Sequence, residues 1–417
     1  MLSRRRFLAG TGVAFGSLGL PAILRAEVAS DGFRILRAGQ GATRGEGQPP
    51  SWRYDGTAPG RTLRLKRGEE LRIRLVNELP EPTTIHWHGV RLPNAMDGVP
   101  HLTQPPVAPG ASFDYVFRPP DAGTFWYHAY ASGQVDRGLH GALIVDEASP
   151  VKVDTDVVLV FGMPGASGGT APFVLVNGSV RPDIPVKAGE RARLRLINAT
   201  SARGFSLRIE RHSPWVMAID GQPAEPFAAR DGRIALGPGS RVDLFVDAMQ
   251  SPGTSTSILA GLRDEQPVAR LVYESGGDTR ATPRSDPPPL PSNPLPARID
   301  LKSSLKVELT FGDGRPGDGK PFDPAGPPLF SVRRGRAVTL GVRNPTGHPR
   351  VVHLHGHHFR LLDRLDDGWK PYWLDTLVVG EQIERIAFVA DNPGKWLIRC
   401  RRLEAAGPDT AVWFAVS

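Results

Sequence analysis

The chain has 417 residues, enough for two or three domains, and its 40% hydrophobic content is enough for real cores. Its 47 glycines and 41 prolines follow no fixed period, which fits an all-β protein with many turns better than a disordered chain. Four arginines of residues 1–26 contribute to the net charge of +8, and removing those four charges leaves +4. No basic block with interleaved aromatic residues stands out, so the sequence argues against nucleic-acid binding.

The first 26 residues predict a twin-arginine signal peptide. Ser3-Arg4-Arg5-Arg6-Phe7-Leu8 is followed by a mildly apolar run. A basic start to a cytosolic protein is the alternative, and this pattern disfavours it. We therefore expect contact with the twin-arginine export machinery and a periplasmic mature protein. No later stretch is apolar enough to span a bilayer, and the one cysteine excludes an internal disulfide.

Short alternating apolar and polar runs recur between turn signals, and this period of two predicts half-buried strands. One phrase, a Gly followed by an alternating run and an Asn, occurs at 66–77, at 187–198 and, more weakly, at 333–344. Segments with a helical period are scarce. Three copies about 120–150 residues apart predict three repeated β-sandwich domains.

The copies also suggest the domain boundaries. We expect a first domain over 30–147, a second over 148–281 and a third over 298–417. The Pro-rich segment 282–297 between the second and third domains predicts an extended and fairly stiff linker.

Four motifs carry residues suited to metal chemistry. His86-Trp87-His88-Gly89 presents two imidazoles on one side of a strand, because residues two apart share a face. A lone His-x-His is weak evidence, but the segment 94–100 after it, Asn-Ala-Met-Asp-Gly-Val-Pro, is more specific. The other motifs are Gly123 to Tyr130, which contains His128, then His353-Leu354-His355-Gly356-His357-His358, and the segment around Cys400.

In this order and spacing, the motifs resemble the three-domain, laccase-like multicopper oxidase family over nearly the whole mature chain. The resemblance is strongest in the first domain and weakest in the second. It implies an all-β fold of three cupredoxin-like Greek-key β-sandwich domains. It also implies a blue copper that takes electrons from an external reductant and a three-copper cluster that reduces O₂ to water.

Carried over position by position, the resemblance gives an incomplete ligand set. It places the lone copper of the cluster on His86 and His353, and the coupled pair on His88, His128 and His355. Six further ligand positions hold residues that do not match the family pattern: Tyr130, Arg350, Arg399, Arg401, Ala405 and Thr410. At the blue site only Cys400 remains. A bulge that returned His348 to that site would still leave it short of ligands.

The arginines at lost ligand positions argue against copper binding more strongly than the missing ligands do. A guanidinium offers no lone pair to a metal. Two unit charges about 4 Å apart repel by about 4 kcal/mol at an effective dielectric of about 20, and a divalent ion doubles this. Arg399 and Arg401 should therefore oppose copper unless they turn toward solvent or carboxylates. We do not expect the full cluster to assemble, whereas a single copper on some of the histidines remains chemically possible.

Two functions follow for this degenerate member of the family. The first is a periplasmic protein with partial copper binding between domains one and three and with impaired or absent O₂-reducing activity. The second is a copper-free structural or interaction protein of the cell envelope. Its copper occupancy would be nil, and its histidines would be hydrogen-bonded core residues. The reductant or protein partner is unknown in both cases.

The remaining candidates have simpler interpretations. Cys400 is interpreted as a buried, inert thiol. Asp97 is interpreted as the start of an Asx turn with Gly98, although the family position helps to handle protons. His357 and His358 are expected in a polar turn and not as ligands.

Overall fold

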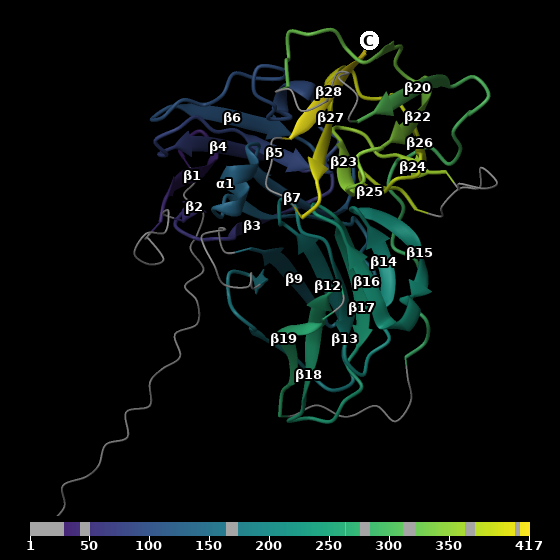
Figure 1. The fold of residues 1–417 in the computed structure, drawn as a ribbon. Helices are drawn as coiled ribbons and strands as arrows, with labels where there is room; N and C mark the ends of the chain where they lie inside the picture. Colours follow the sequence, from purple (N-terminus) through teal and green to yellow (C-terminus); the bar gives the residue numbers. More distant parts are fainter. Residues whose placement is uncertain are drawn as a thin grey trace, which may run out of the picture.

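The computed structural model describes residues 29–41, 51–163, 174–262, 264–275, 284–311, 322–362, 372–404 and 409–417. The predicted signal peptide and Ala405 lie outside these residues. Figure 1 shows three β-sandwiches, with the second one (teal) below the first (purple to blue) and the third (green to yellow). The predicted all-β class is confirmed, while the exact domain boundaries stay a prediction.

The first sandwich packs a sheet in the order β2-β1-β4-β6 against a sheet in the order β3-β8-β7-β5. Its strands and short helices are β1 (Arg34–Gln40), β2 (Trp52–Tyr54), β3 (Gly60–Lys66), β4 (Leu71–Asn77), β5 (Ile85–His88), η1 (Asn94–Met96), β6 (Ser112–Phe117), β7 (Gly123–Ala129), α1 (Ser132–Asp136) and β8 (His140–Asp146).

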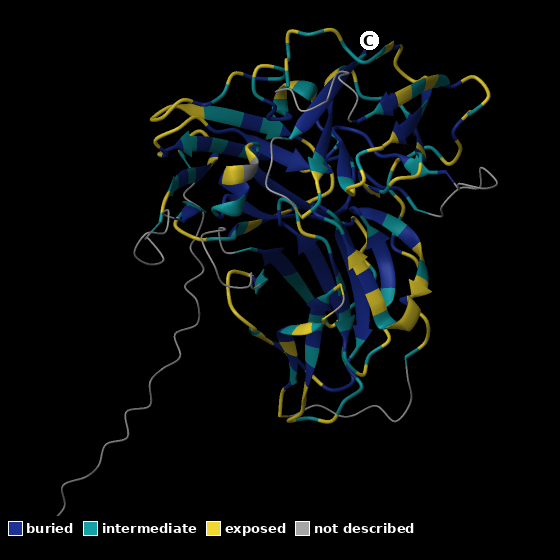
Figure 2. Cartoon of the chain, viewed as in Figure 1, coloured by how far each residue is buried: buried dark blue, intermediate teal, exposed yellow. Residues whose placement is uncertain are grey.

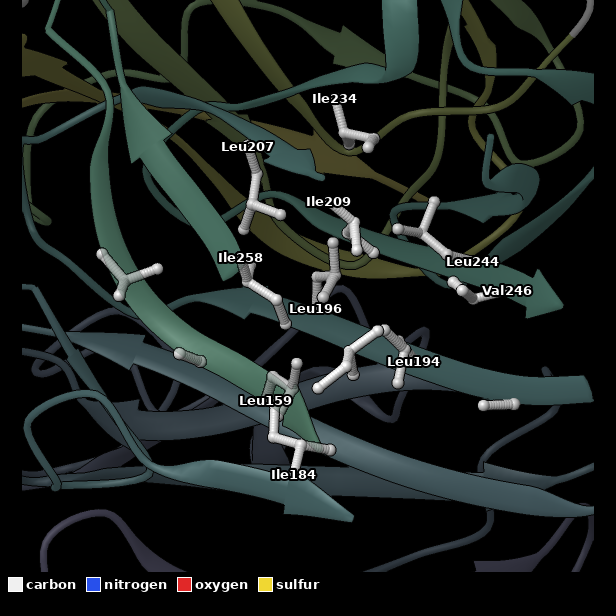
Figure 3. Close-up of a cluster of buried hydrophobic side chains, with 14 of the residues drawn as sticks. Leu159, Ile184, Leu194, Leu196, Leu207, Ile209, Ile234, Leu244, Val246 and Ile258 are labelled. Carbon is white, nitrogen blue, oxygen red and sulfur yellow. The ribbon is translucent and has the colours of Figure 1, made fainter. Parts of the chain in front are cut away.

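The second sandwich has sheets in the orders β10-β9-β12-β17-β14-β15 and β11-β19-β18-β13-β16. Its elements are β9 (Thr155–Gly162), β10 (Leu175–Val176), β11 (Asp183–Val186), β12 (Arg191–Asn198), β13 (Phe205–Ile209), β14 (Trp215–Ile219), β15 (Gln222–Ala228), η2 (Arg230–Gly232), β16 (Arg233–Leu236), β17 (Arg241–Asp247), β18 (Ser255–Gly261) and β19 (Gln266–Tyr273). Leucine, isoleucine and valine side chains from both sheets meet in its core (Figure 3).

The third sandwich has sheets in the orders β20-β22-β26-β24 and β21-β28-β27-β23-β25. Its strands are β20 (Leu305–Thr310), β21 (Ser331–Val332), β22 (Ala337–Arg343), β23 (Arg350–Leu354), β24 (Arg360–Leu361), β25 (Thr376–Val379), β26 (Glu384–Val389), β27 (Gly394–Arg402) and β28 (Thr410–Val416). No helix in the described ranges is long and apolar enough to cross a membrane.

The phrase repeated in the sequence forms the same structure three times. The three copies form strands β4, β12 and β22. Each of them pairs in parallel with the first strand of its own sandwich, which is β1, β9 or β20. The Asn at the end of each copy donates two hydrogen bonds through Nδ2. The acceptors are the carbonyls of Glu81 and Val107 for Asn77, of Arg203 and Leu236 for Asn198, and of His348 and Val379 for Asn344. The repeated Asn therefore fixes the loop that leaves each of these strands.

Strand β12 is buried on both faces, unlike a strand at a surface (Figure 2). Leu194 and Leu196 enter the core of the second sandwich. On the other face, Arg193 binds Asp243 at 2.6 Å, and Arg195 binds Asp156 at 2.7 Å. Such a face is stable only because each buried guanidinium has carboxylate partners. Both acids lie on neighbouring strands of the same sheet, and the face meets the first domain where Arg195 Nη1 donates to Thr124 Oγ1 at 3.1 Å.

Arg241 of β17 joins all three sandwiches at one buried point. Its Nη2 lies 2.5 Å from Asp375 of the third sandwich, and its Nε donates to the carbonyl of Thr124 in the first at 3.3 Å. Its side chain has 0% exposure. The second domain thereby positions the contact between the first and third, where the candidate site lies.

Candidate metal centre

The structure brings five of the eleven histidines together in one buried cluster. His86 and His88 lie on β5, and His128 lies opposite His86 on the neighbouring strand β7. His353 lies on β23, and His355 follows that strand. The ring centroids of His88 and His353 are 3.7 Å apart, and those of His86 and His355 are 4.0 Å apart. The predicted set converges, and its role as a ligand set stays a prediction.

Backbone carbonyls fix the tautomers of three of these rings. The Nδ1 atoms of His86, His128 and His353 lie 2.9, 2.7 and 3.0 Å from the carbonyl oxygens of Asp97, Ala129 and Asp375. A carbonyl oxygen only accepts hydrogen bonds, so each Nδ1 must carry the proton. Each Nε2 is then left with a lone pair, which is the form in which imidazole binds a metal.

The Nε2 lone pairs converge without donors to satisfy them. The Nε2 atoms of His86 and His353 lie 3.3 Å apart. His355 donates from Nδ1 to Asp97 Oδ2 at 3.0 Å, and its own Nε2 is buried without a hydrogen-bond partner among the described residues, as is that of His128. Several buried acceptors without a donor are costly, and a cation between them would remove that cost.

His88 presents its other nitrogen. Thr376 donates its hydroxyl proton to Asp375 Oδ1 at 2.7 Å, so it accepts from His88 Nε2 at 3.0 Å. The lone pair of His88 is therefore on Nδ1. Gly89 makes this arrangement possible, because a Cβ there would lie 2.2 Å from Arg241 Nη2 and 2.6 Å from Asp375 Oδ2.

Four of the five histidines are held in the neutral form. Burial lowers the pKa values of His88, His128 and His355 well below the usual range, and neighbouring imidazoles lower them further. Burial also lowers the pKa of His353 to about 4. Metal binding at neutral pH would thus not have to displace protons from these rings.

Three groups of possible ligand atoms result, each with all atoms within 4.8 Å of one another. They are His86 with His88 and His128, His86 with His353 and His355, and His88 with His353 and Asp375. His86, His88 and His353 each belong to two groups. They are therefore the centre of the cluster.

Asp97 does not have the role interpreted from the sequence. Its carboxylate lies 3.0 Å from His355 Nδ1 and 3.2 Å from His86 Nδ1, and the residue is 1% exposed. Burial raises the pKa of Asp97, but His355 and His86 lower it more, so the pKa falls below its usual range. An anionic carboxylate under two imidazoles orients them, which an Asx turn does not require.

The arginines at two lost ligand positions turn to a carboxylate. Arg399 donates from Nε to Asp409 Oδ2 at 2.8 Å and from Nη2 to the carbonyl of Tyr130 at 2.8 Å. Its guanidinium also lies 4.5 Å from the centre of the Tyr130 ring. Arg401 donates from Nε to the same Asp409 oxygen at 3.3 Å. Asp409 therefore offsets part of the charge that should oppose copper.

The blue-copper position is filled by a different contact. Arg350 Nη1 lies 3.9 Å from Cys400 Sγ, and Thr410 donates its hydroxyl proton to the Cys400 carbonyl at 3.4 Å. The side chain of His348 is exposed in the loop before β23. Cys400 is fully buried, and burial raises its pKa to about 11, as expected of an inert thiol.

Four residues that support the site were not predicted from the sequence: Arg241, Asp375, Thr376 and Asp409. The signal for Asp375 was a lone acid in the apolar stretch Trp373-Leu374-Asp375-Thr376-Leu377. Arg241 and Asp409 have no local signal, because their partners are distant in sequence or in another strand. His357 and His358 lie in the loop after β23, where a polar turn was expected, but they are buried, and His358 Nε2 lies 3.4 Å from Asp375.

Multicopper oxidase family models match the chain over residues 38–150, 122–269 and 294–417. Multicopper oxidase MmcO of Mycobacterium tuberculosis is 28% identical, over 83% of this chain and 79% of that protein.

Among solved structures, a multi-copper oxidase from Pseudomonas thermotolerans is 32% identical with a TM-score of 0.81, over 92% of this chain and 98% of that one. Another from Pseudomonas parafulva is 30% identical with a TM-score of 0.79, over 92% and 100%. The expected cupredoxin-like sandwich fold is confirmed.

Proposed function

Because this chain belongs to the multicopper oxidase family, we propose that it is an exported protein that binds one copper ion between its first and third domains and lacks the four-electron reduction of O₂. The observation that carries this proposal is the pair of Nε2 lone pairs on His86 and His353, 3.3 Å apart, with both Nδ1 protons held by carbonyls.

The histidine cluster fits copper in chemistry and spacing. Two nitrogens 3.3 Å apart suit one ion with metal–nitrogen bonds of about 2 Å. Neutral imidazole is a good copper ligand, and His128 or His355 offers a further unpartnered Nε2. When bound, copper would supply a one-electron redox centre. The chain's own part is to hold the rings through Asp97 and the Asp375–Arg241 pair and to exclude water.

The blue-copper position does not fit. Cys400 has Arg350 beside its sulfur where the family has an imidazole, and Thr410 replaces the thioether. Without an electron-accepting blue copper, electrons from an external donor have no entry to the cluster. Arg399 and Arg401 further remove two ligands of the coupled pair. These four replacements support a function without the oxidase cycle.

The place of action is part of the proposal. The twin-arginine pattern of residues 1–26 supports export of the folded protein to the periplasm. An external reductant or a protein partner would meet it there. Periplasmic copper binding is compatible with a fold that offers neutral histidines before any metal arrives.

A copper-free scaffold is the second candidate. It is supported by the contacts Arg399–Asp409 and Arg350–Cys400, which satisfy several lost ligand positions without metal. In that case the histidine cluster would serve only to join the first and third domains.

Copper per chain separates these functions. Protein exported by its own signal in copper-supplied cells should contain about one copper by elemental analysis, and His86→Gln with His353→Gln should remove it. His101→Gln, at an exposed turn position, is the matched control. A value near zero supports the scaffold, and three or four coppers per chain would restore the oxidase function.

Spectroscopy tests the blue-site part separately. The copper-loaded protein should lack the intense blue thiolate-to-copper absorption, and its paramagnetic resonance should show imidazole nitrogens only. A blue band would contradict the inert role given to Cys400.

A further inference from the structure

A cavity of ≈ 30 Å³ lies between the histidine cluster and the two arginines of β27. Its wall is formed by His88, Trp126, Ser201, Pro238, Gly239, Val351, His353, Arg399 and Arg401. A single water needs about 10–15 Å³ measured in this way. The cavity is therefore large enough for one small ion or two waters, and too small for an organic substrate.

The charges around this cavity are unequal. Arg399 and Arg401 both donate to one carboxylate oxygen, Oδ2 of Asp409. Asp136 accepts from the hydroxyl of Ser201 at 2.7 Å and attracts Arg401 electrostatically, but it makes no hydrogen bond to either guanidinium in the described structure. Two guanidinium cations therefore share one hydrogen-bonded anion.

Arg401 is poorly satisfied for a guanidinium in this position. Its side chain is 14% exposed, and its hydrogen bonds within the described residues are long, 3.3 Å to Asp409 and 3.4 Å to the carbonyl of Ser201. A guanidinium has five N–H donors in a fixed fork. Donors of Arg401 thus remain available at the cavity wall, where each could bind an anion by a charge-assisted hydrogen bond.

The rest of the wall does not repel an anion. Val351, Trp126 and Pro238 are apolar, and the wall contains no carboxylate. The imidazole rings of His88 and His353 complete the polar part of the wall. An occupant would meet two cations, no acid and a desolvated surround in which electrostatic attraction is strengthened.

We propose that Arg399 and Arg401, which replace metal ligands, form a binding site for one small monovalent inorganic anion of the size of chloride or nitrite. Asp409 and Asp136 offset much of the charge of the two guanidinium groups, so a monovalent anion suits the site better than a divalent one, and the volume of ≈ 30 Å³ sets the size. The inference does not depend on copper, because the cations, the carboxylate and the cavity belong to the chain alone.

The test uses metal-free, full-length mature protein. In gluconate buffer of constant ionic strength, added chloride should raise Tm and then saturate, because a bound anion stabilises only the folded state. Arg401→Gln should weaken chloride binding by about tenfold or more, the effect expected for one charge-assisted hydrogen bond. Arg402→Gln changes the next, exposed arginine and should leave the response intact.

A second variant guards against a folding defect in Arg401→Gln. Val351→Leu keeps both arginines and fills the cavity, so it should also abolish the saturable response. Crystals soaked in bromide should show one anomalous peak between Arg399, Arg401 and His88. No bromide in the cavity, or the same chloride response in wild type, Arg401→Gln and Val351→Leu, would overturn the proposal and leave the copper proposal standing.

Discussion

The Nε2 atoms of His86 and His353 lie 3.3 Å apart, although 267 positions separate the two residues and they belong to different sandwiches. This contact exists only when the first and third domains are docked. Docking in turn uses Arg241 of the second domain, which binds Asp375 beneath His353. The candidate metal centre is therefore a property of the assembled three-domain chain and of no single domain.

The carboxylate of Asp97 should set copper affinity without binding copper. Asp97→Asn replaces an anion that lies 3.0 Å from His355 Nδ1 and 3.2 Å from His86 Nδ1. Loss of such a supporting group costs about 10–100-fold in metal affinity. Competition against a chromophoric copper chelator measures this. Asp300→Asn, at an exposed loop, should bind copper like the wild type, and equal affinity for both variants would remove Asp97 from the site.

Arg241 should be one of the most destabilising residues to truncate. Arg241→Ala leaves Asp375 and Asp220 buried without their cation. Even with Arg241 present, burial and the charge of Asp375 raise the pKa of Asp220 to about 6. Breaking a buried pair in this way costs about 3–5 kcal/mol.

The midpoint of urea unfolding gives the effect of Arg241→Ala. Arg270→Ala is the matched control, because the side chains of its pair with Asp183 are 53% and 51% exposed. An exposed pair contributes about 0–1 kcal/mol. If both variants unfold at the same urea concentration, the three-domain junction is not held by Arg241.

The class and repeat of the fold could be predicted because they are local. The alternation in 71–76, 192–197 and 337–342 marks strands, and the same phrase recurs in each domain. The structural role of the final Asn of the phrase could not be predicted, because Asn77, Asn198 and Asn344 donate hydrogen bonds to carbonyl groups that are distant in sequence. Nor did the alternation show that β12 is buried on both faces, since its arginines are paired by acids from elsewhere in the sequence.

The candidate site also contains some features that the sequence predicted and others that it did not. The five histidines could be found from spacing and family resemblance, but their tautomers depend on acceptors such as the carbonyls of Asp97 and Asp375. The orientation of Arg399 and Arg401 on β27 depends on Asp409, which directly precedes the neighbouring strand β28. Asp97 was assigned to a turn because its contact with His355 spans 258 positions. Charge partners of this kind follow from docking, not from local pattern.

His140 should make the stability of the protein depend on pH. It is buried, and burial lowers its pKa to about 4, against about 6.5 in an unfolded chain. Below pH 6.5 the unfolded state binds a proton that the folded state does not bind. The free energy of unfolding therefore decreases as the pH is lowered, and this decrease levels off below pH 4. The loss from this one residue is up to about 3 kcal/mol.

Urea midpoints of metal-free protein between pH 7 and pH 4 measure the contribution of His140. His140→Gln cannot titrate, so its midpoint should fall less steeply than that of the wild type. His101→Gln, at an exposed position, should keep the wild-type slope. Parallel slopes for the wild type and His140→Gln would mean that His140 is already protonated in the folded state.

Changing Arg399 and Arg401 to His should raise copper uptake above that of the wild type. Each change removes a cation that lacks a lone pair and supplies an imidazole beside His88 and His128. Asp409 then loses its two arginine partners and adds a negative charge near the metal, which favours a cation further. Elemental analysis of the double variant should give at least one more copper per chain.

Arg402→His is the control, because it adds a histidine on the exposed side of β27 and should not raise the copper content. If both variants hold as much copper as the wild type, the arginines are not what limits the metal content, and the missing ligands at Tyr130 and around Cys400 must account for it instead.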